Sequence, residues 1–194
     1  MGKKPTVKLD LKKKVTKDST TSVSTPSAQS PTLCGAQLAA RYDQIITERI
    51  TKARILYGLS ISFIVDLLLT SGCRVSEALA LCKSQQITNQ SFMIRGLKGS
   101  KDRIVYTTYC YSDVVFCGLG DGPLSQVFSR FSIYRVCKRL GIVWNDGNNQ
   151  HNAVTHAGRH FVAELLLKEG FSVADVQNFL GHRRISSTEF YAKE

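Results

Sequence analysis

The sequence contains no apolar stretch long enough to cross a membrane. Its most apolar run, Ile61–Leu69, is short and contains Asp66, whereas a transmembrane helix needs about 20 apolar residues. The lysine-rich N-terminus is not followed by the apolar run that a secretory signal peptide requires. No internal repeat is visible either. We therefore expect neither a membrane span nor a signal peptide.

The cysteines and the acidic residues form no recognisable ligand pattern. The six cysteines are irregularly spaced and include no C-x-x-C pair, which predicts buried thiols in a reducing, intracellular setting rather than a disulfide scaffold. His156 and His160 are four residues apart and could share a metal, but no H-E-x-x-H motif accompanies them and Arg159 between them would repel a cation. Neither a metal nor another cofactor is implied.

Positive charge is what the sequence has in excess. The formal net charge is +11, from 26 basic and 15 acidic residues. Residues 1–33 hold seven lysines and two aspartates, so about half of the excess lies outside this segment. The segment has almost nothing to bury, so we interpret it as a disordered basic tail or linker. A basic folded part favours a polyanionic partner such as double-stranded DNA.

Residues 34–194 read as one folded domain, mainly α with a small three-stranded antiparallel sheet. Helical spacing of apolar residues and β-favouring runs separated by polar turns carry this prediction. The expected helices are 33–52, 55–69, a turn from Arg74, 124–140, and two between 155 and 181, and the expected strands are 86–88, 92–94 and 104–106.

The C-terminal stretch from Thr155 to Tyr191 carries the helix-capping signals. Thr155 is the expected N-cap of one helix, and Ser172 with Asp175 forms an S-x-x-D capping box for the next. Glycines stand where each apolar run stops, as C-terminal caps do. The stretch therefore predicts two helices, a Gly-His corner and a short segment that ends in a tyrosine.

The same stretch combines the chemistry of an anion site with a nucleophile. His156 and Arg159 lie three residues apart, so they share the N-terminal end of one helix face. A helix N-terminus already favours an anion. His182 and Tyr191 follow at the corner and in the last segment. Taken singly, each residue has an ordinary structural explanation, and their joint spacing is what favours a phosphate site.

Three motifs together resemble the catalytic domain of the tyrosine recombinases, the phage-integrase family. TSGCRVSEALAL is similar to the family's first arginine box, and LKGSKDRIV to its K-G-x-K-x-R turn. THAGRHFVAELLLKEGFSVADVQNFLGHRRISSTEFY is similar to the H-x-L-R-H, L-G-H and Y segments. The resemblance covers about residues 35–193 and implies that family's catalytic fold.

The resemblance also implies roles for individual residues. Tyr191 would attack a DNA phosphate, and His156 would act as general acid or base. Lys98 would protonate the leaving 5′ oxygen, a role for which Lys101 has a weaker claim. The non-bridging oxygens would be held by Arg74, Arg159 and His182. DNA contacts are expected from four basic residues of the same motifs, namely Lys101, Arg103, Arg183 and Arg184.

Two departures from the family pattern affect what we expect. Ala157-Gly158 replaces the usual residue and leucine before the arginine, which should loosen a packing contact. The sequence also shows neither a preceding DNA-clamping domain nor a C-terminal segment for exchange between subunits. DNA grip and self-assembly into a dimer or tetramer could therefore depend on an accessory DNA-binding protein.

The resemblance implies DNA strand exchange by a tyrosine recombinase. Three other functions stay open at this point. A type IB topoisomerase would use similar residues to relax DNA without exchanging strands. A DNA-binding protein that needs a partner for strand exchange would keep the basic surface alone. A metal-dependent nuclease is disfavoured because the acidic residues are not clustered.

Overall fold

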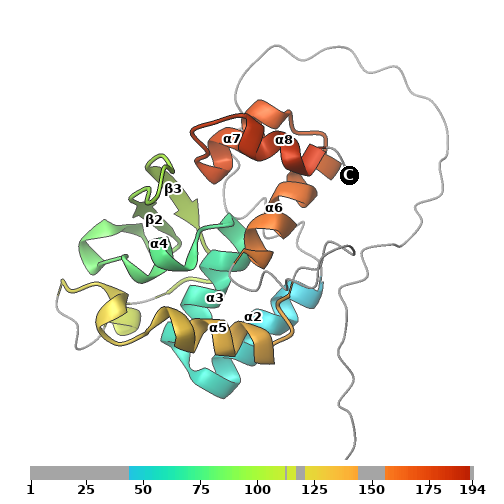
Figure 1. Cartoon of the computed structure of the whole chain (residues 1–194). Coiled ribbons are helices and arrows are strands. Elements are labelled where there is room, and N and C mark those ends of the chain that lie inside the picture. The colour runs from blue at the N-terminus through green and yellow to red at the C-terminus, as the bar shows by residue number, and fades with distance from the viewer. Residues whose placement is uncertain (1–43, 112, 117–120, 144–155, 193–194) are drawn as a thin grey trace, which may run out of the picture.

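The computed structural model describes residues 44–111, 113–116, 121–143 and 156–192 (Figure 1). The predicted tail at 1–33, the first part of the first predicted helix and the predicted cap Thr155 lie outside this part of the chain. The described part consists of helices and one small antiparallel sheet. The predicted fold class is thereby confirmed.

Helix α3 (Leu59–Ser71) is the centre of the molecule. It contacts α2 (Gln44–Tyr57), α4 (Val75–Leu79), strand β3 and α6, and every residue from Ile61 to Ser71 is buried. The boundary between the first two helices lies later in the chain than the predicted ranges of 33–52 and 55–69. Helix α2 runs on to Tyr57, and Gly58 makes the turn with a positive φ of 83°, a conformation that favours glycine.

The sheet has the order β1-β2-β3, with strands Gln86–Thr88, Ser91–Ile94 and Arg103–Tyr106, all antiparallel to their neighbours. These are the three predicted strands. A short 3₁₀ turn, η1 (Lys83–Gln85), leads into β1. The connection between β2 and β3 projects from the sheet and carries Lys98, which adopts a left-handed conformation with φ 52°.

The segment after the sheet begins its helix later than predicted. Two 3₁₀ turns, η2 (Asp113–Phe116) and η3 (Leu124–Gln126), precede α5 (Arg130–Arg139). The predicted continuous helix over 124–140 is wrong because the Ser129 side chain accepts a hydrogen bond from the backbone N–H of Ser132 and so caps a new helix.

The C-terminal helices α6 (Ala157–Lys168), α7 (Val173–Leu180) and α8 (Ser186–Ala192) gather at one end of the molecule (Figure 1). They surround a small apolar cluster, separate from the large one around α3. The predicted capping box of Ser172 and Asp175 is confirmed, and Gly181 ends α7 in the left-handed conformation.

Helix α6 packs closely against α3 at Gly158. A Cβ atom at Gly158 would lie 2.2 Å from the carbonyl oxygen of Leu68, a distance that real side chains do not tolerate. The expectation that Ala157-Gly158 loosens this contact is therefore wrong. The glycine allows the backbones to approach, and a leucine here would push the two helices apart.

Candidate active site

The first arginine of the candidate site is set by a close turn after α3. Gly72 has φ 60°, and a Cβ atom there would lie 2.7 Å from Leu180 Cδ2 and 3.3 Å from the Cα of Arg159. Arg74, two residues on, is the N-cap of α4, so the turn places its side chain beside the C-terminal helices.

Arg74 and Arg103 share one buried carboxylate. Glu77 Oε1 accepts from Arg74 Nη1 at 3.2 Å, and Oε2 accepts from Arg103 Nη2 at 2.9 Å. Burial raises the pKa of Glu77, but the hydrogen bond and charge of Arg103 outweigh it and keep the pKa below its ordinary value. Two cations on one anion leave a positive charge at the site.

Arg103 corrects one expectation. Its side chain is buried and turned inward to Glu77, so in this arrangement it does not present its guanidinium to DNA. The alternation along β3 explains this, because Arg103 and Val105 face inward while Ile104 faces solvent.

The turn that carries Lys98 lies against the corner between α7 and α8. Ser100 and His182 form an isolated antiparallel bridge, and the Lys101 N–H donates to the Gly181 carbonyl at 2.8 Å. Residues far apart in the sequence are thereby joined. Four exposed basic side chains surround the junction, namely Lys98, Lys101, Arg183 and Arg184.

A small cavity lies where these elements meet. Its volume is about 70 Å³, which is the volume of about two water molecules, so it suits a small anion better than a base. It is lined by Arg74, Val75, Ser76, Lys98, Arg130 and His156. Arg130 was not among the predicted site residues, because the predicted helix over 124–140 placed it in a helix interior, whereas α5 begins at this residue.

His156 is the N-cap of α6. Burial lowers its pKa below the ordinary value, and the charges of Arg74, Arg159, Arg130 and Lys98 lower it further. The imidazole is therefore neutral at pH 7 and able to accept a proton.

Arg159 is deeply buried and fixed by three acceptors. Its Nη1 donates to the Gly72 carbonyl at 3.0 Å, Nη2 to the Leu180 carbonyl, and Nε to His182 Nε2 at 3.0 Å. Burial lowers its pKa to about 10, with further lowering by Arg74 and Arg103. A guanidinium has five N–H donors, so two of them are left for a ligand.

His182 is engaged on both ring nitrogens. Nε2 accepts from Arg159, and Nδ1 lies 2.8 Å from the Thr188 hydroxyl. The expected donation from His182 to a phosphate is thus unavailable in this arrangement, because the nitrogen nearest Arg159 is an acceptor. Burial and the Arg159 charge lower the His182 pKa to about 4, so the ring is neutral at pH 7.

Tyr191 lies beside His182 and His160. Its ring is parallel to that of His182, with centroids 6.3 Å apart, and meets the edge of His160 at 5.0 Å. Burial raises its pKa, while the charges of Arg159 and Arg74 oppose the rise. The phenol is therefore protonated at pH 7 and needs a base before it can act as a nucleophile.

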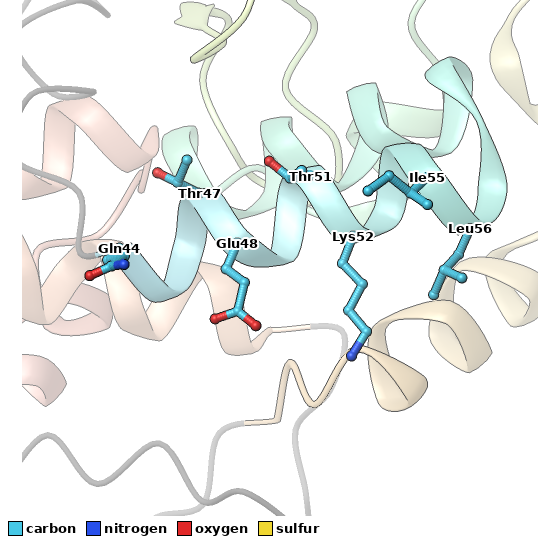
Figure 2. Close-up of a pocket in the computed structure, with 7 residues that line it drawn as sticks. All are labelled: Gln44, Thr47, Glu48, Thr51, Lys52, Ile55 and Leu56. Atoms are coloured by element: carbon cyan, nitrogen blue, oxygen red, sulfur yellow. The ribbon is translucent and has the colours of Figure 1, made fainter.

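A second hollow, of about 550 Å³, follows one exposed face of α2 (Figure 2). It is lined by side chains of that helix alone, Gln44, Thr47, Glu48, Thr51, Lys52, Ile55 and Leu56. None of the sequence-predicted site residues reaches it.

Within the described ranges, no three His, Cys, Asp or Glu side chains gather to hold a metal ion. No helix there is long and apolar enough to cross a membrane.

The six residues predicted to act on a phosphate lie in two groups. Arg74, Lys98 and His156 line the cavity, and Arg159 and Tyr191 both contact His182. The Arg74 charge acts to lower the pKa of both His182 and Tyr191. Glu77, Arg130 and Thr188 join them without having been predicted. Neutral bases, a protonated phenol and several cations form a site suited to nucleophilic attack on an anion.

Comparison with known proteins gives consistent matches. The family described as "Phage integrase family" matches residues 41–194. Tyrosine recombinase XerC of Bradyrhizobium diazoefficiens is 30% identical over 149 residues, which cover 66% of this chain and 44% of the relative. Tyrosine recombinase XerD of Staphylococcus aureus is 30% identical over 147 residues, covering 66% and 48%. The chain thus spans less than half the length of these curated relatives.

Solved structures show the same fold. The catalytic domain of bacteriophage HP1 integrase superposes with a TM-score of 0.51 at 24% identity, covering 78% of this chain and 85% of that one. The XerH site-specific recombinase bound to difH substrate, in a pre-cleavage complex, superposes with a TM-score of 0.51 at 21% identity, covering 84% and 50%.

Proposed function

Because the chain belongs to the phage integrase family, we propose that it is a site-specific tyrosine recombinase. It breaks and rejoins DNA strands through a 3′-phosphotyrosine intermediate. The observation that carries this proposal is the cavity lined by Arg74, Lys98 and His156, together with the contacts of Arg159 and Tyr191 with His182. Curated relatives with the name tyrosine recombinase support it.

In the first step, Tyr191 Oη attacks the phosphorus of the scissile phosphate. The bond between Oη and phosphorus forms, and the bond from phosphorus to the 5′ oxygen breaks. His156 takes the phenolic proton, which its lowered pKa permits because the ring is neutral at pH 7. Lys98 gives a proton to the leaving 5′ oxygen. A second 5′-hydroxyl then reverses the step on another strand.

The two arginines stabilise the charge that develops on the phosphate. Forked guanidinium donors match the geometry of phosphate oxygens. Arg74 is held by Glu77, and Arg159 by three acceptors, so both are oriented before DNA binds. Preorganised donors of this kind are each worth about 3–4 kcal/mol in the transition state.

The reaction proposed here needs neither a metal nor ATP. The cations supply the electrostatic stabilisation, and the energy of the broken phosphodiester is retained in the phosphotyrosine. The partner is double-stranded DNA, which places the protein with DNA inside the cell. Exposed Lys101, Arg183 and Arg184 are proposed to contact the backbone near the cleaved phosphate. Self-assembly on DNA and an accessory DNA-binding protein complete the proposal.

The test is covalent trapping on nicked DNA from the flanks of the protein's own gene. A nick beside the scissile phosphate lets the short 5′-ended strand diffuse away, so the phosphotyrosine accumulates. We expect a protein–DNA adduct that survives denaturant and resists EDTA. Absence of the adduct on every nicked position would contradict the proposal. Relaxation of any supercoiled plasmid without site preference would instead indicate a topoisomerase.

A further inference from the structure

Thr188 is a buried hydroxyl in an otherwise exposed helix. Its exposed fraction is 0%, and it is the buried residue of α8. A buried hydroxyl normally has a hydrogen-bond partner. The partner of Thr188 is His182 Nδ1, at 2.8 Å. The contact therefore anchors α8 to the corner that follows α7.

The partners of His182 determine which ring nitrogen carries the hydrogen. Arginine has donors and no acceptor, so His182 Nε2 accepts from Arg159 Nε at 3.0 Å. A neutral imidazole with an accepting Nε2 carries its hydrogen on Nδ1. That N–H then donates to the Thr188 hydroxyl oxygen. The hydrogen bonds run in one direction, from Arg159 to His182 to Thr188.

This chain of hydrogen bonds joins the arginine of α6 to the helix of the nucleophile. Arg159 is fixed at its other end by the Gly72 carbonyl. Thr188 and Tyr191 are three residues apart on α8 and so share one helical face, and the Tyr191 ring is parallel to that of His182. A change at Thr188 is thus transmitted both to Arg159 and to Tyr191.

We propose that the Thr188 hydroxyl accepts from the Nδ1–H of His182, the tautomer that Arg159 selects, and thereby positions the His182 ring, Arg159 and α8 before DNA binds. Thr188 is a positioning residue, because it acts through His182. The effect on cleavage rests on the proposed function, whereas the tautomer assignment does not.

The hydroxyl also permits the opposite arrangement. A threonine hydroxyl can donate as well as accept, so Thr188 can pair with a His182 ring that carries its hydrogen on Nε2. In that form Nε2 would face a bound phosphate as a donor. Thr188 therefore reconciles the role expected for His182 from the family resemblance with the geometry of the free protein. Valine has nearly the same shape but cannot make either contact.

The first measurement is the nitrogen-15 NMR spectrum of the histidine rings of the free full-length chain at pH 7. The resonances that vanish in His182→Gln identify His182. We expect the wild type, Thr188→Ser and Thr188→Val all to carry the hydrogen on Nδ1, which Arg159 selects, and only Thr188→Val to shift the Nδ1 resonance, because its Nδ1–H has lost its acceptor. Ser187→Ala, which changes an exposed neighbour on the same helix, should give the wild-type spectrum.

The second measurement is the rate of adduct formation on the nicked DNA described above. Loss of the partner that orients a metal-ligating histidine typically costs about 10–100-fold, and Thr188 orients His182 in the same way. We expect Thr188→Val to be about 10–100-fold slower than the wild type. Thr188→Ser and Ser187→Ala should stay within about threefold, because both keep the hydroxyl-to-His182 contact.

Three outcomes would overturn the inference. The wild type could carry the His182 hydrogen on Nε2 in the absence of DNA. Thr188→Val could match the wild type in both spectrum and rate. Thr188→Ser could be as slow as Thr188→Val, which would assign the effect to the methyl group. A wild type with the expected tautomer but no adduct on any nicked DNA would contradict the proposed function and leave the tautomer assignment intact.

Discussion

Arg74 and Tyr191 belong to parts of the molecule that are anchored to very different degrees. Arg74 follows α3, in which every residue from Ile61 to Ser71 is buried and the apolar ones belong to the large apolar cluster. Tyr191 lies on α8, where Thr188 is the buried residue. The large cluster draws on helices and strands from across the chain, and the smaller one on α6 and α7.

This difference matches what each part would have to do in the proposed reaction. Cations that stabilise a transition state are most effective when they are already oriented, and a deep core with a buried ion pair provides that orientation. A nucleophile has to meet the phosphate and later release it, and elements that move are drawn from the less stable parts of a fold. The weak anchoring of α8 is therefore consistent with a role in which Tyr191 changes position.

The largest expected effect is a loss of covalent DNA attachment with almost no change in protein stability. Tyr191→Phe should abolish covalent attachment to nicked DNA, because the attacking oxygen is lost. The ring contacts with His182 and His160 stay, so the free energy of unfolding should change by less than about 0.5 kcal/mol. Denaturing gels and chemical unfolding measure the two quantities. An adduct that persists in Tyr191→Phe and maps to another residue would contradict the assignment.

The next prediction concerns Lys98, one of the cations that line the small cavity. Lys98→Ala should slow adduct formation by about 10²–10⁴-fold, the usual contribution of a general acid. Replacing the leaving 5′ oxygen with sulfur should restore most of the rate, because a thiolate leaves without a proton. Lys101→Ala is the matched control from the same turn. Rescue of Lys101→Ala instead would transfer the role to Lys101.

The buried ion pair should account for much of the anchoring on the Arg74 side. Glu77→Gln leaves Arg74 and Arg103 without a counter-charge, and removing one partner of a buried pair costs about 3–5 kcal/mol. Chemical denaturation should show this loss. The control is Glu48→Gln on the exposed face of α2 (Figure 2), which should change stability by about 0.5 kcal/mol or less. Equal effects would mean that the ion pair contributes little.

The same core also contains a buried carboxylate that makes stability depend on pH. Burial raises the pKa of Asp66 to about 6, although hydrogen bonds from Thr108, Tyr109 and Tyr111 lower it. The folded state therefore binds a proton more tightly than the unfolded state. The contribution of this group to stability falls as pH rises from about 4 to about 6.

At about 1.4 kcal/mol per pKa unit, the change amounts to up to about 3 kcal/mol. Asp66→Asn carries no titrating group and should lose this component. We expect the stability difference between wild type and Asp66→Asn to shift toward the variant as pH rises from 4 to 7. Denaturant unfolding across that range measures the shift, and a difference that is constant with pH would contradict the prediction.

The sequence was sufficient to predict much of the fold and to name six candidate site residues, and the reasons for the failures are physical. Strands and helix caps are local patterns, so the three strands and the Ser172 box could be predicted. Arg130 joins the site from a distant element, and Glu77 also pairs with Arg103, 26 residues away, so no local pattern indicates these contacts. The inward orientation of Arg103 depends on the register of β3 against the core.

The role of Gly158 also could not be predicted from the sequence. In the sequence it looks like a missing side chain and hence a loose contact. Its actual role depends on the distance between two backbones, which a comparison of side chains does not reveal.

The smallest expected effect concerns the contact between α6 and α3. Gly158→Ala would raise helix propensity by about 1 kcal/mol if the methyl group had room. Because its Cβ would lie 2.2 Å from the Leu68 carbonyl oxygen, we expect a net loss of about 1–3 kcal/mol instead. Gly170→Ala is the control, since its Cβ meets nothing within 4 Å and only its positive φ opposes the change, at about 1–2 kcal/mol.

Both variants should unfold more easily, but only Gly158→Ala should also slow adduct formation, because displacing the start of α6 moves the adjacent Arg159 and His156. A more stable Gly158→Ala protein with an unchanged rate would show that α6 can shift away from α3 without disturbing the site.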